Sequence, residues 1–482
     1  MSTTSPEYSP TAPFKLEAHF ASALPAMAAP WHGEDAPDPQ LVILNEELAH
    51  RLGLDPQWLR SEAGIQFLVG LNPQPLTKAV AQAYSGHQFG QFVASLGDGR
   101  ALLLGEARSA DGVLRDIHLK GSGRTPFSRG ADGRSILGPV LREYLVSEAM
   151  HSLGVPTTRA LAVLTTGRKI QRGTVSPGAI LVRVATSHIR VGSFQYSNIA
   201  GGVDLSQDLA NYAIIRNFPE LAAGLDNPTP ELYVSLFRAI LRRQATTVGK
   251  WTRLGFVHGA LNTDNTLISG ETIDYGPCAF MERYRGDAKF SSIDNYSRYK
   301  FDNQPVILGW NMTRLVETLI PLLGDTPDEG MTAAQEALSE FDSLCEQAIA
   351  QEFAAALGID PAESEVIAHF RQLLYQYNPD ITTLLRCLTD NTAPPAGFEF
   401  FAHTWKTLDP DIEAMRTVNP IFIPRNHLVE AALSQAVEGD FNAFHELLAA
   451  VCDPFNPDAG SAELHGPSPD GFEEDYMTFC GT

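Results

Sequence analysis

The sequence contains little cysteine, and its cysteines follow no pattern. Five occur in 482 residues, unevenly spaced and odd in number. Disulfide-rich secreted scaffolds and zinc sites need paired or closely spaced cysteines. The cysteine content therefore argues against both classes; the positions are Cys278, Cys345, Cys387, Cys452 and Cys480.

Positive charge is also scarce. Lys and Arg number 35 against 57 Asp and Glu, a formal net charge of −22. Non-specific nucleic-acid binding needs a basic surface that displaces counterions, so we expect no nucleic-acid partner. The basic residues are concentrated in one Gly-rich region where a nucleotide could bind, at Arg100, Arg108, Arg115, Lys120, Arg124, Arg129, Arg134 and Arg142.

The sequence has no apolar run long enough to span a bilayer, so we expect no membrane partner. Residues 1–20 show neither the apolar core of a secretory signal nor the Arg-rich composition of a transit peptide, and we predict a cytoplasmic location. The hydrophobic content of 44% is sufficient for one large or two ordinary cores.

Residues 258–276 show the clearest chemistry. Asn265 and Asp274 flank two short apolar segments, 266–268 and 272–273, with a Ser-Gly-Glu turn between them. A β-hairpin of this size brings its two ends together, so the two side chains should face the same space. Two oxygen ligands there suit Mg²⁺ or Mn²⁺.

This pattern is similar to the metal loop of protein kinases, where an Asn and the Asp of an Asp-Phe-Gly turn bind metal. Here the turn reads Asp274-Tyr275-Gly276. Kinases carry their catalytic Asp five residues before the metal-binding Asn, but that position is Ala260. The nearest carboxylate is Asp264.

Upstream, alternating apolar residues predict a β-rich region. Gly97-Asp98-Gly99-Arg100 reads as a tight turn between two strands, and the turn alone is no more than a hairpin signal. The periodicity predicts further strands at 116–120, 159–165 and 179–186, and a helix at 138–153. Farther along the chain, it predicts amphipathic helices at 364–377 and 381–389.

Lys120 ends a predicted strand and Glu143 lies on the predicted helix. In kinases, such a pair fixes the lysine against the nucleotide phosphates, and we predict the same ion pair here. Asp132 and Gly133 lie in the linker between them, whose backbone N–H groups could hold phosphates.

Arg183 and Arg190 admit two interpretations. Arg183 lies in an alternating strand and should point away from the face that its apolar neighbours bury. An arginine on a strand commonly forms a surface ion pair. Two arginines facing a cleft beside the lysine would instead neutralise a triphosphate.

We predict an α+β fold of the bilobed protein-kinase type. A β-rich lobe precedes a helical lobe that carries the metal loop, with an N-terminal segment wrapped around the first lobe and a helical C-terminal extension. The predicted boundaries are 1–75 for the N-terminal extension, which includes a helix at 40–52, then 76–195, 196–392 and 393–482.

These motifs closely resemble the selenoprotein O family, in its bacterial cysteine-containing form. The resemblance runs from about residue 14 to the C-terminus. It rests on Ser-Gly-His-Gln-Phe-Gly (85–90), Leu-Gly-Asp-Gly-Arg (96–100), His-Leu-Lys-Gly-Ser-Gly-Arg-Thr-Pro-Phe-Ser-Arg (118–129), His-Gly-Ala-Leu-Asn-Thr-Asp-Asn (258–265) and Asp-Tyr-Gly-Pro-Cys-Ala-Phe-Met (274–281).

The resemblance implies a protein adenylyltransferase that transfers AMP from ATP to Ser, Thr or Tyr hydroxyls, with ATP reversed relative to kinases. It implies that Asn265 and Asp274 bind metal and that Asp264 accepts the proton. The residues that it implies for ATP binding are Gly97, Gly99, Arg100, Lys120, Asp132, Gly133, Arg183, Arg190 and Asp274.

A reversed triphosphate is consistent with the positive charges of the arginines in the predicted β-rich region. Its γ end would enter the pocket where kinases hold adenine, and that pocket would need to be basic. Self-modification and UMP transfer from UTP are variants of this reaction. A true kinase, which Ala260 disfavours, and an inactive nucleotide-binding scaffold are the alternatives.

Two cysteines suggest regulation. Cys278 follows the Asp-Tyr-Gly turn, and Cys480 is third from the C-terminus, where some family members carry selenocysteine. A disulfide between them would tie the tail to this segment and make activity depend on redox state. Two unrelated thiols are the alternative, because cytosolic disulfides are uncommon.

Overall fold

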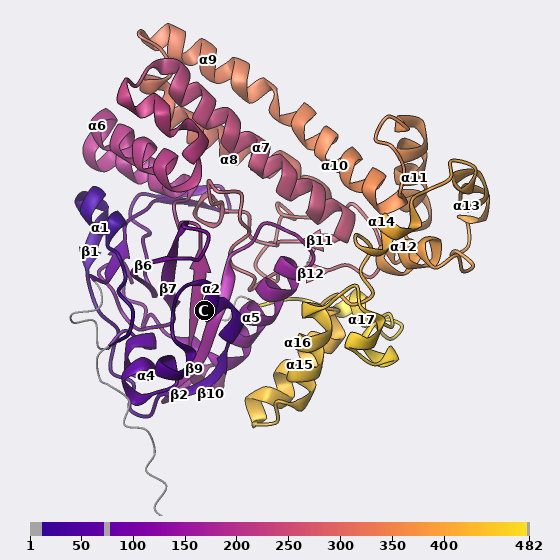
Figure 1. Ribbon diagram of the computed structural model, residues 1–482, viewed down its shortest axis with the longest axis horizontal. Helices are drawn as coiled ribbons and strands as arrows, with labels where there is room; N and C mark the ends of the chain where they lie inside the picture. Colours follow the sequence, from indigo (N-terminus) through magenta and orange to yellow (C-terminus); the bar gives the residue numbers. More distant parts are fainter. Residues whose placement is uncertain (1–11, 72–77, 480–482) are drawn as a thin grey trace, which may run out of the picture.

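The computed structural model describes residues 12–71 and 78–479, and it shows a mixed α+β architecture (Figure 1). Its main element is an eight-stranded sheet whose pairings are antiparallel. In spatial order the strands are β1 (Ala28–Pro30), β3 (Val80–Gln82), β6 (Ala101–Arg108), β7 (Leu114–Lys120), β10 (Thr174–Ala185), β9 (Arg159–Arg172) and β2 (Gln40–Leu44), with β8 (Ser135–Ile136) paired to β10.

The strand period of two gives the sheet two different faces. On β7, Ile117 and Leu119 pack into an apolar cluster beneath the sheet, with α2 (Glu46–Arg51), α3 (Pro56–Leu59) and α4 (Glu62–Leu68). His118 and Lys120 therefore point to the opposite face. Arg183 lies directly opposite His118 in the β7–β10 register and shares that face.

The N-terminal segment contributes strands to the sheet. The predicted helix at 40–52 is wrong over its first five residues, because β2 (Gln40–Leu44) pairs with β9. Leu41, Val42 and Ile43 are apolar, and the latter two are β-branched, which favours a strand. Asn45 then caps α2 by accepting a hydrogen bond from the Leu48 N–H at 3.0 Å.

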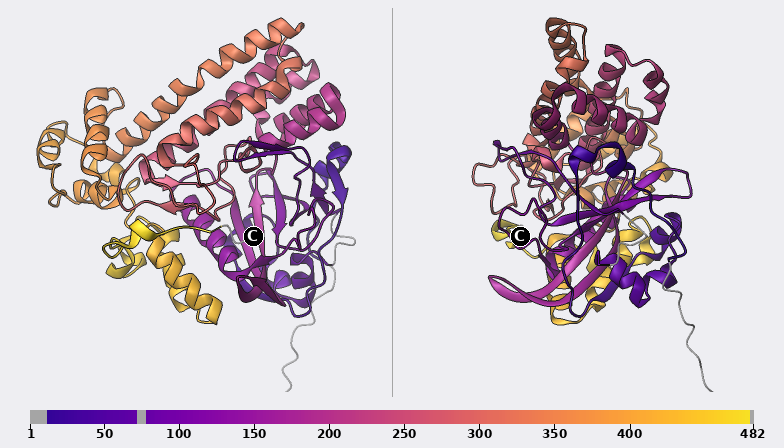
Figure 2. Two further views of the ribbon diagram at one scale, coloured as in Figure 1. Left: turned by 180° about the vertical axis from the view of Figure 1, so that it is seen from behind. Right: turned by 90° about the vertical axis from the view of Figure 1, so that its left-hand side faces the viewer.

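Helices cover the face of the sheet that carries the polar residues. The helix α5 (Leu137–Ser152) packs on β9 and β10. Figure 1 shows a second layer of helices above one end of the sheet, and Figure 2 shows it from two other sides. This layer contains α6 (Val191–Asn217), α7 (Pro230–Leu254), α8 (Gln304–Leu319), α9 (Pro327–Ser339) and α10 (Phe341–Leu357).

The hairpin predicted at 266–273 is reduced to a single bridge between Thr266 and Thr272. The backbone of Leu267 instead pairs with Arg190, outside the predicted hairpin. The strands found in this region are β11 (Phe256–Val257) and β12 (Ala279–Phe280), which pair with each other. The loop is therefore held by contacts with distant segments.

The C-terminal region is helical, as its apolar periodicity predicts. Its helices are α11 (Ser364–Tyr377), α12 (Ile381–Thr389), α13 (Glu399–Lys406), α14 (Ile412–Arg416), α15 (Asn426–Glu438), α16 (Asn442–Cys452) and α17 (Phe472–Asp475). Both α15 and α16 pack against α5 (Figure 1). Among the described residues, none of the helices combines the length and the apolar character that a membrane crossing would require.

Candidate functional site

A cavity of about 440 Å³ lies where the polar face of the sheet meets the loop at 258–276. Its wall brings together eleven residues that the sequence analysis proposed for nucleotide or metal binding. They are Gly97, Gly99, Arg100, Lys120, Asp132, Gly133, Arg183, Arg190, Asp264, Asn265 and Asp274.

Lys120 occupies the centre of this cavity. Its ammonium group forms ion pairs with the Glu143 carboxylate of α5 and, at 2.6 Å, with Asp274 Oδ1. Burial alone would raise the pKa of Asp274, but the positive charges of Lys120, Arg100 and Arg183 hold that pKa well below its usual range. Asp274 is therefore a carboxylate at neutral pH.

The backbone at Asp274 is unusual. Its φ angle is +69°, a left-handed conformation that costs energy for a residue with a side chain. The buried ring of His258 lies beneath this turn and is 2.8 Å from the carbonyl oxygen of Ile273. These contacts fix the direction in which the Asp274 carboxylate points.

Asn265 and Asp264 approach from a short 3₁₀ turn, η3 (Thr263–Asn265). Asn265 Nδ2 donates to Asp274 Oδ2 at 3.3 Å and to the Ala260 carbonyl at 3.0 Å, which leaves its amide oxygen for another partner. Asp264 is buried, and burial raises its pKa to about 6. Its Oδ1 atom has no hydrogen-bond partner among the described residues.

These donors fit a hard divalent cation. The Asp274 carboxylate and the Asn265 amide oxygen are ligands that Mg²⁺ or Mn²⁺ takes, with water and phosphate completing the shell. No group of three or more His, Cys, Asp and Glu in metal-binding geometry occurs among the described residues. The chain alone would therefore supply few ligands.

Arginines form the other side of the cavity. Arg183 Nη1 donates to Glu143 Oε1 at 3.3 Å. The Arg190 guanidinium stacks over the Tyr84 ring at 4.0 Å and donates to the Asp264 carbonyl at 3.0 Å. The Arg100 side chain lines the cavity and has no hydrogen-bond or ion-pair partner in the part of the chain that the structure describes.

Two glycines allow loops to meet closely at the cavity. Gly97 has a φ of +57°, and a Cβ there would lie 2.3 Å from the Phe127 ring. Gly133 has a φ of +66°, and its Cβ would lie 2.1 Å from the Gly123 carbonyl oxygen. Gly97 lets the 97–99 turn meet the loop at 121–134, and Gly133 lets the two arms of that loop meet each other. Asp132 closes this loop through an ion pair of 2.6 Å with Arg172.

Other cavity residues were not predicted. Tyr84 directly precedes the Ser-Gly-His motif, and this position next to a motif could have indicated that it lines the cavity. Arg172 ends β9, which extends seven residues beyond the predicted strand end at 165. No feature of the sequence indicated that Arg172 lines the cavity. The remaining unpredicted wall residues include Gln88, Phe127 and Ile293, whereas Arg129 and Arg134 belong to the basic region in which the sequence suggested nucleotide binding.

The sequence matches the profile of the family described as "Protein adenylyltransferase SelO" over residues 11–397. The chain belongs to the SelO family. A Corynebacterium glutamicum relative named "Protein nucleotidyltransferase YdiU" is 79% identical over 472 residues, covering 98% of this chain and all of the relative. Relatives of the same name from Corynebacterium efficiens and a Mycobacterium species are 62% and 49% identical, with at least 97% of each chain covered.

Family membership identifies the chain as an enzyme, a nucleotidyltransferase. Such an enzyme takes a nucleotide as substrate, which implies a divalent metal beside the phosphates. The SelO-family motifs quoted from the sequence lie in or beside the cavity, since residues from all five of them form its wall.

Cys278 lies beneath this cavity, buried with 1% of its surface exposed. Its thiol donates to the Tyr275 carbonyl at 3.1 Å, and burial raises its pKa to about 12. Cys480 lies outside the described residues. Thr478, close to it in sequence, donates a hydrogen bond of 2.7 Å to the Pro277 carbonyl, so the described tail ends next to Cys278.

Proposed function

We propose that this protein transfers AMP from ATP to Ser, Thr or Tyr hydroxyls of proteins, with the triphosphate reversed relative to its orientation in kinases. The observation that carries the proposal is the distribution of charge in the cavity. Arg100, Lys120 and Arg183 project from the sheet side, where a kinase holds adenine, and carboxylates project from the loop side.

The arrangement also supports a kinase-like bilobed fold. The sheet carries the lysine, α5 carries its glutamate partner, and the loop beyond carries Asn265 and Asp274. In a kinase this frame would place the γ-phosphate near the metal. A reversed nucleotide would place the α-phosphate there and the γ end among the arginines.

In the proposed reaction, the acceptor oxygen bonds to the α-phosphorus as the bond to the α–β bridging oxygen breaks, and pyrophosphate leaves. Asp264 accepts the hydroxyl proton, since its Oδ1 atom is free of partners and its backbone is held by Arg190. Lys120, Arg183 and Arg190 neutralise the phosphates and orient them. Bound Mg²⁺ or Mn²⁺, held by Asn265 and Asp274, would stabilise charge on the α-phosphate.

The decisive experiment uses ATP labelled separately at the α- and γ-phosphates, with Mg²⁺ or Mn²⁺, a mixture of candidate proteins, and an Asp274→Ala control. We expect α-label on protein, including the enzyme itself, and no label with Asp274→Ala. Label from the γ position alone would indicate a kinase. No label in reduced or oxidised samples would indicate an inactive scaffold. Parallel α-labelled UTP tests UMP transfer.

We also propose redox control through a Cys278–Cys480 disulfide. The contact between Thr478 and Pro277 supports it, because this contact holds the tail beside Cys278. Oxidised glutathione would take the two electrons as both thiols lose their protons and the S–S bond forms. Mass mapping of the non-reduced protein tests this, and the absence of a linked Cys278–Cys480 peptide after oxidation would refute it.

A further inference from the structure

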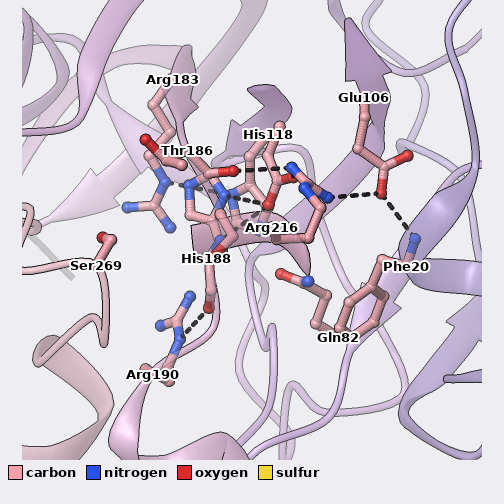
Figure 3. A network of polar contacts seen from close by, with 12 residues as sticks. Phe20, Gln82, Glu106, His118, Arg183, Thr186, His188, Arg190, Arg216 and Ser269 are labelled. Atoms are coloured by element: carbon pink, nitrogen blue, oxygen red, sulfur yellow. Dashed lines mark hydrogen bonds and ion pairs between the residues drawn. The ribbon is translucent and has the colours of Figure 1, made fainter. Parts of the chain in front are cut away.

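Behind the cavity, the sheet holds a buried cluster of charged and histidine side chains to which the proposed reaction assigns no role (Figure 3). The six side chains are at most 2% exposed. Burial of so much charge is costly unless each group is paired. The members are Asp98, Glu106, Asp116, His118, His188 and Arg216.

One part of the cluster leads from the glycine turn to a cavity arginine. His118 Nε2 is 3.0 Å from Asp98 Oδ2, and His118 Nδ1 accepts a hydrogen bond of 3.2 Å from Arg183 Nε. The far end of the same guanidinium contacts Glu143. No described residue accepts a hydrogen bond from Arg183 Nη2, which leaves that edge for a ligand in the cavity.

A second part repeats this order of residues. His188 Nδ1 lies 3.1 Å from Asp116 Oδ2, and the His188 carbonyl accepts a hydrogen bond of 3.2 Å from Arg190 Nε. Arg190 Nη2 is buried and has no partner among the described residues. An aspartate therefore holds each imidazole ring, but Arg183 contacts the ring of His118, whereas Arg190 contacts the main chain of His188.

The two imidazole rings stack on each other. Their centroids are 4.1 Å apart with an interplanar angle of 18°. Figure 3 shows the guanidinium groups of Arg183 and Arg190 on the same side of this stack, and Glu106 and Phe20 on the other. The stack restricts the tilt of the His118 ring, and the His118 ring in turn holds Arg183.

The contacts require a neutral His118. Its Nε2–H donates to Asp98, and its Nδ1 must carry a lone pair to accept from Arg183. Burial, together with the charges of Arg183 and Arg190, lowers the pKa of His118 despite the opposing effect of Asp98. Burial and the neighbouring His118 hold the pKa of His188 well below its usual value. Two charged rings could not stack this closely.

Asp98 connects this cluster to the glycine turn. It lies between Gly97 and Gly99, and its carboxylate accepts a hydrogen bond of 2.9 Å from the Gln82 N–H as well as the one from His118. Its carbonyl accepts from Thr125 Oγ1 at 2.6 Å, in the loop that closes the cavity. The same aspartate thus fixes the turn and the ring that holds Arg183.

We propose that His118 and His188 form a positioning platform that orients Arg183 and Arg190 toward the triphosphate. The Nδ1 atom of His118 holds the Arg183 guanidinium, and the main-chain carbonyl of His188, a residue anchored by Asp116, holds that of Arg190. The two histidines are positioning residues, since neither lines the cavity. This inference rests on the proposed function, in which those arginines bind phosphate. The platform explains why charged side chains are buried behind the cavity, which the proposed reaction by itself does not explain.

Two neutral substitutions separate the contacts of His118. In His118→Asn, the amide oxygen lies near the position of Nδ1 and can accept from Arg183, but the side chain is too short for Asp98. In His118→Gln, the amide nitrogen can reach Asp98, but the Nδ1 acceptor is lost. We expect ATP to bind about tenfold more weakly to His118→Gln, and within about threefold of wild type for His118→Asn.

The dissociation constant of ATP with Mg²⁺ is measured by calorimetry on the full chain, with Tm recorded for each variant. In an Arg183→Ala background, His118→Gln should weaken ATP binding little further, because the histidine acts through that arginine. Glu106→Gln is the matched control: it alters the same buried cluster but contacts neither cavity arginine, so it should lower Tm and leave ATP affinity unchanged.

Equal ATP affinities for His118→Gln and His118→Asn would overturn the inference, whatever their stabilities. If Arg183→Ala weakens ATP binding and His118→Gln does not, the platform is refuted while the proposed function stands. If the wild-type protein binds no ATP, both fail.

Discussion

Gly86 determines how closely the main chain of β4 (Gly86–Gln88) approaches the Asp264 carboxylate. A Cβ at this position would lie 2.7 Å from Asp264 Oδ1 and 2.8 Å from Leu96 Cδ2. The glycine therefore leaves space for the proposed proton acceptor. The Ser-Gly-His motif alone does not show that Gly86 packs against Asp264.

We predict that Gly86→Ala lowers kcat for AMP transfer at least tenfold, because displacing Asp264 by a fraction of an ångström misaligns the proton acceptor. Steady-state transfer of α-label measures this. Gly138→Ala is the control, since its Cβ meets only Val437 at 3.6 Å and should leave kcat unchanged. An unaltered kcat for Gly86→Ala would argue against Asp264 as the acceptor.

At the scale of elements, α5 connects the cavity to the C-terminal region. Next to Glu143 in sequence, Arg142 donates to the Cys278 carbonyl at 2.8 Å, to Tyr476 Oη at 3.0 Å and to Glu430 of α15 at 2.8 Å. The arginine is buried, so its loss would leave the Cys278 carbonyl without this partner, while Tyr476 would still donate to Glu430 at 2.8 Å.

We predict that Arg142→Met lowers Tm and makes the Cys278 thiol more accessible to alkylation, because the segment that buries it loses a hydrogen bond. Loss of the positive charge by itself would raise the pKa of this thiol further, so a faster reaction would report exposure. In the intact protein that thiol should react slowly, because it is buried and its pKa is raised to about 12. Alkylation followed by peptide mapping measures the rate at this cysteine. Arg416→Met removes an exposed ion pair with Glu413 and should leave the rate unchanged. Similar rates in both variants would contradict the prediction.

At the scale of the whole molecule, the cavity lies between the sheet and the loop at 258–276. Lys120 of the sheet contacts Asp274 of the loop across it. A nucleotide that touches both sides would stabilise the native state by mass action, by about 2.7 kcal/mol at a concentration 100 times its Kd.

We therefore predict that ATP with Mg²⁺ raises the Tm of the wild-type protein and raises that of Lys120→Met much less. Thermal unfolding over a range of ATP concentrations measures the shift. Lys250→Met is the matched control, because Lys250 pairs with Glu352 on α10, in the helical layer outside the cavity wall. An equal shift in both variants would show that Lys120 does not contact the nucleotide.

Much of this fold could be read from local sequence. The apolar periodicity predicts α11 and α12 with the bounds that the structure shows, at Ser364–Tyr377 and Ile381–Thr389. It also predicts β7 and α5 to within a few residues. Such elements are set by contacts along one helix or strand, so the local pattern is sufficient.

The sequence by itself determined which chemistry the protein carries: the spacing of the lysine, the glutamate and the Asn–Asp pair, and the family to which they belong. Only the tertiary structure decided the rest. Residues 40–44 form a strand because β9 lies beside them, and the Asn265 loop is held by Arg190 instead of a hairpin. His118 and Arg183 are 65 positions apart and meet only because their strands pair in one register.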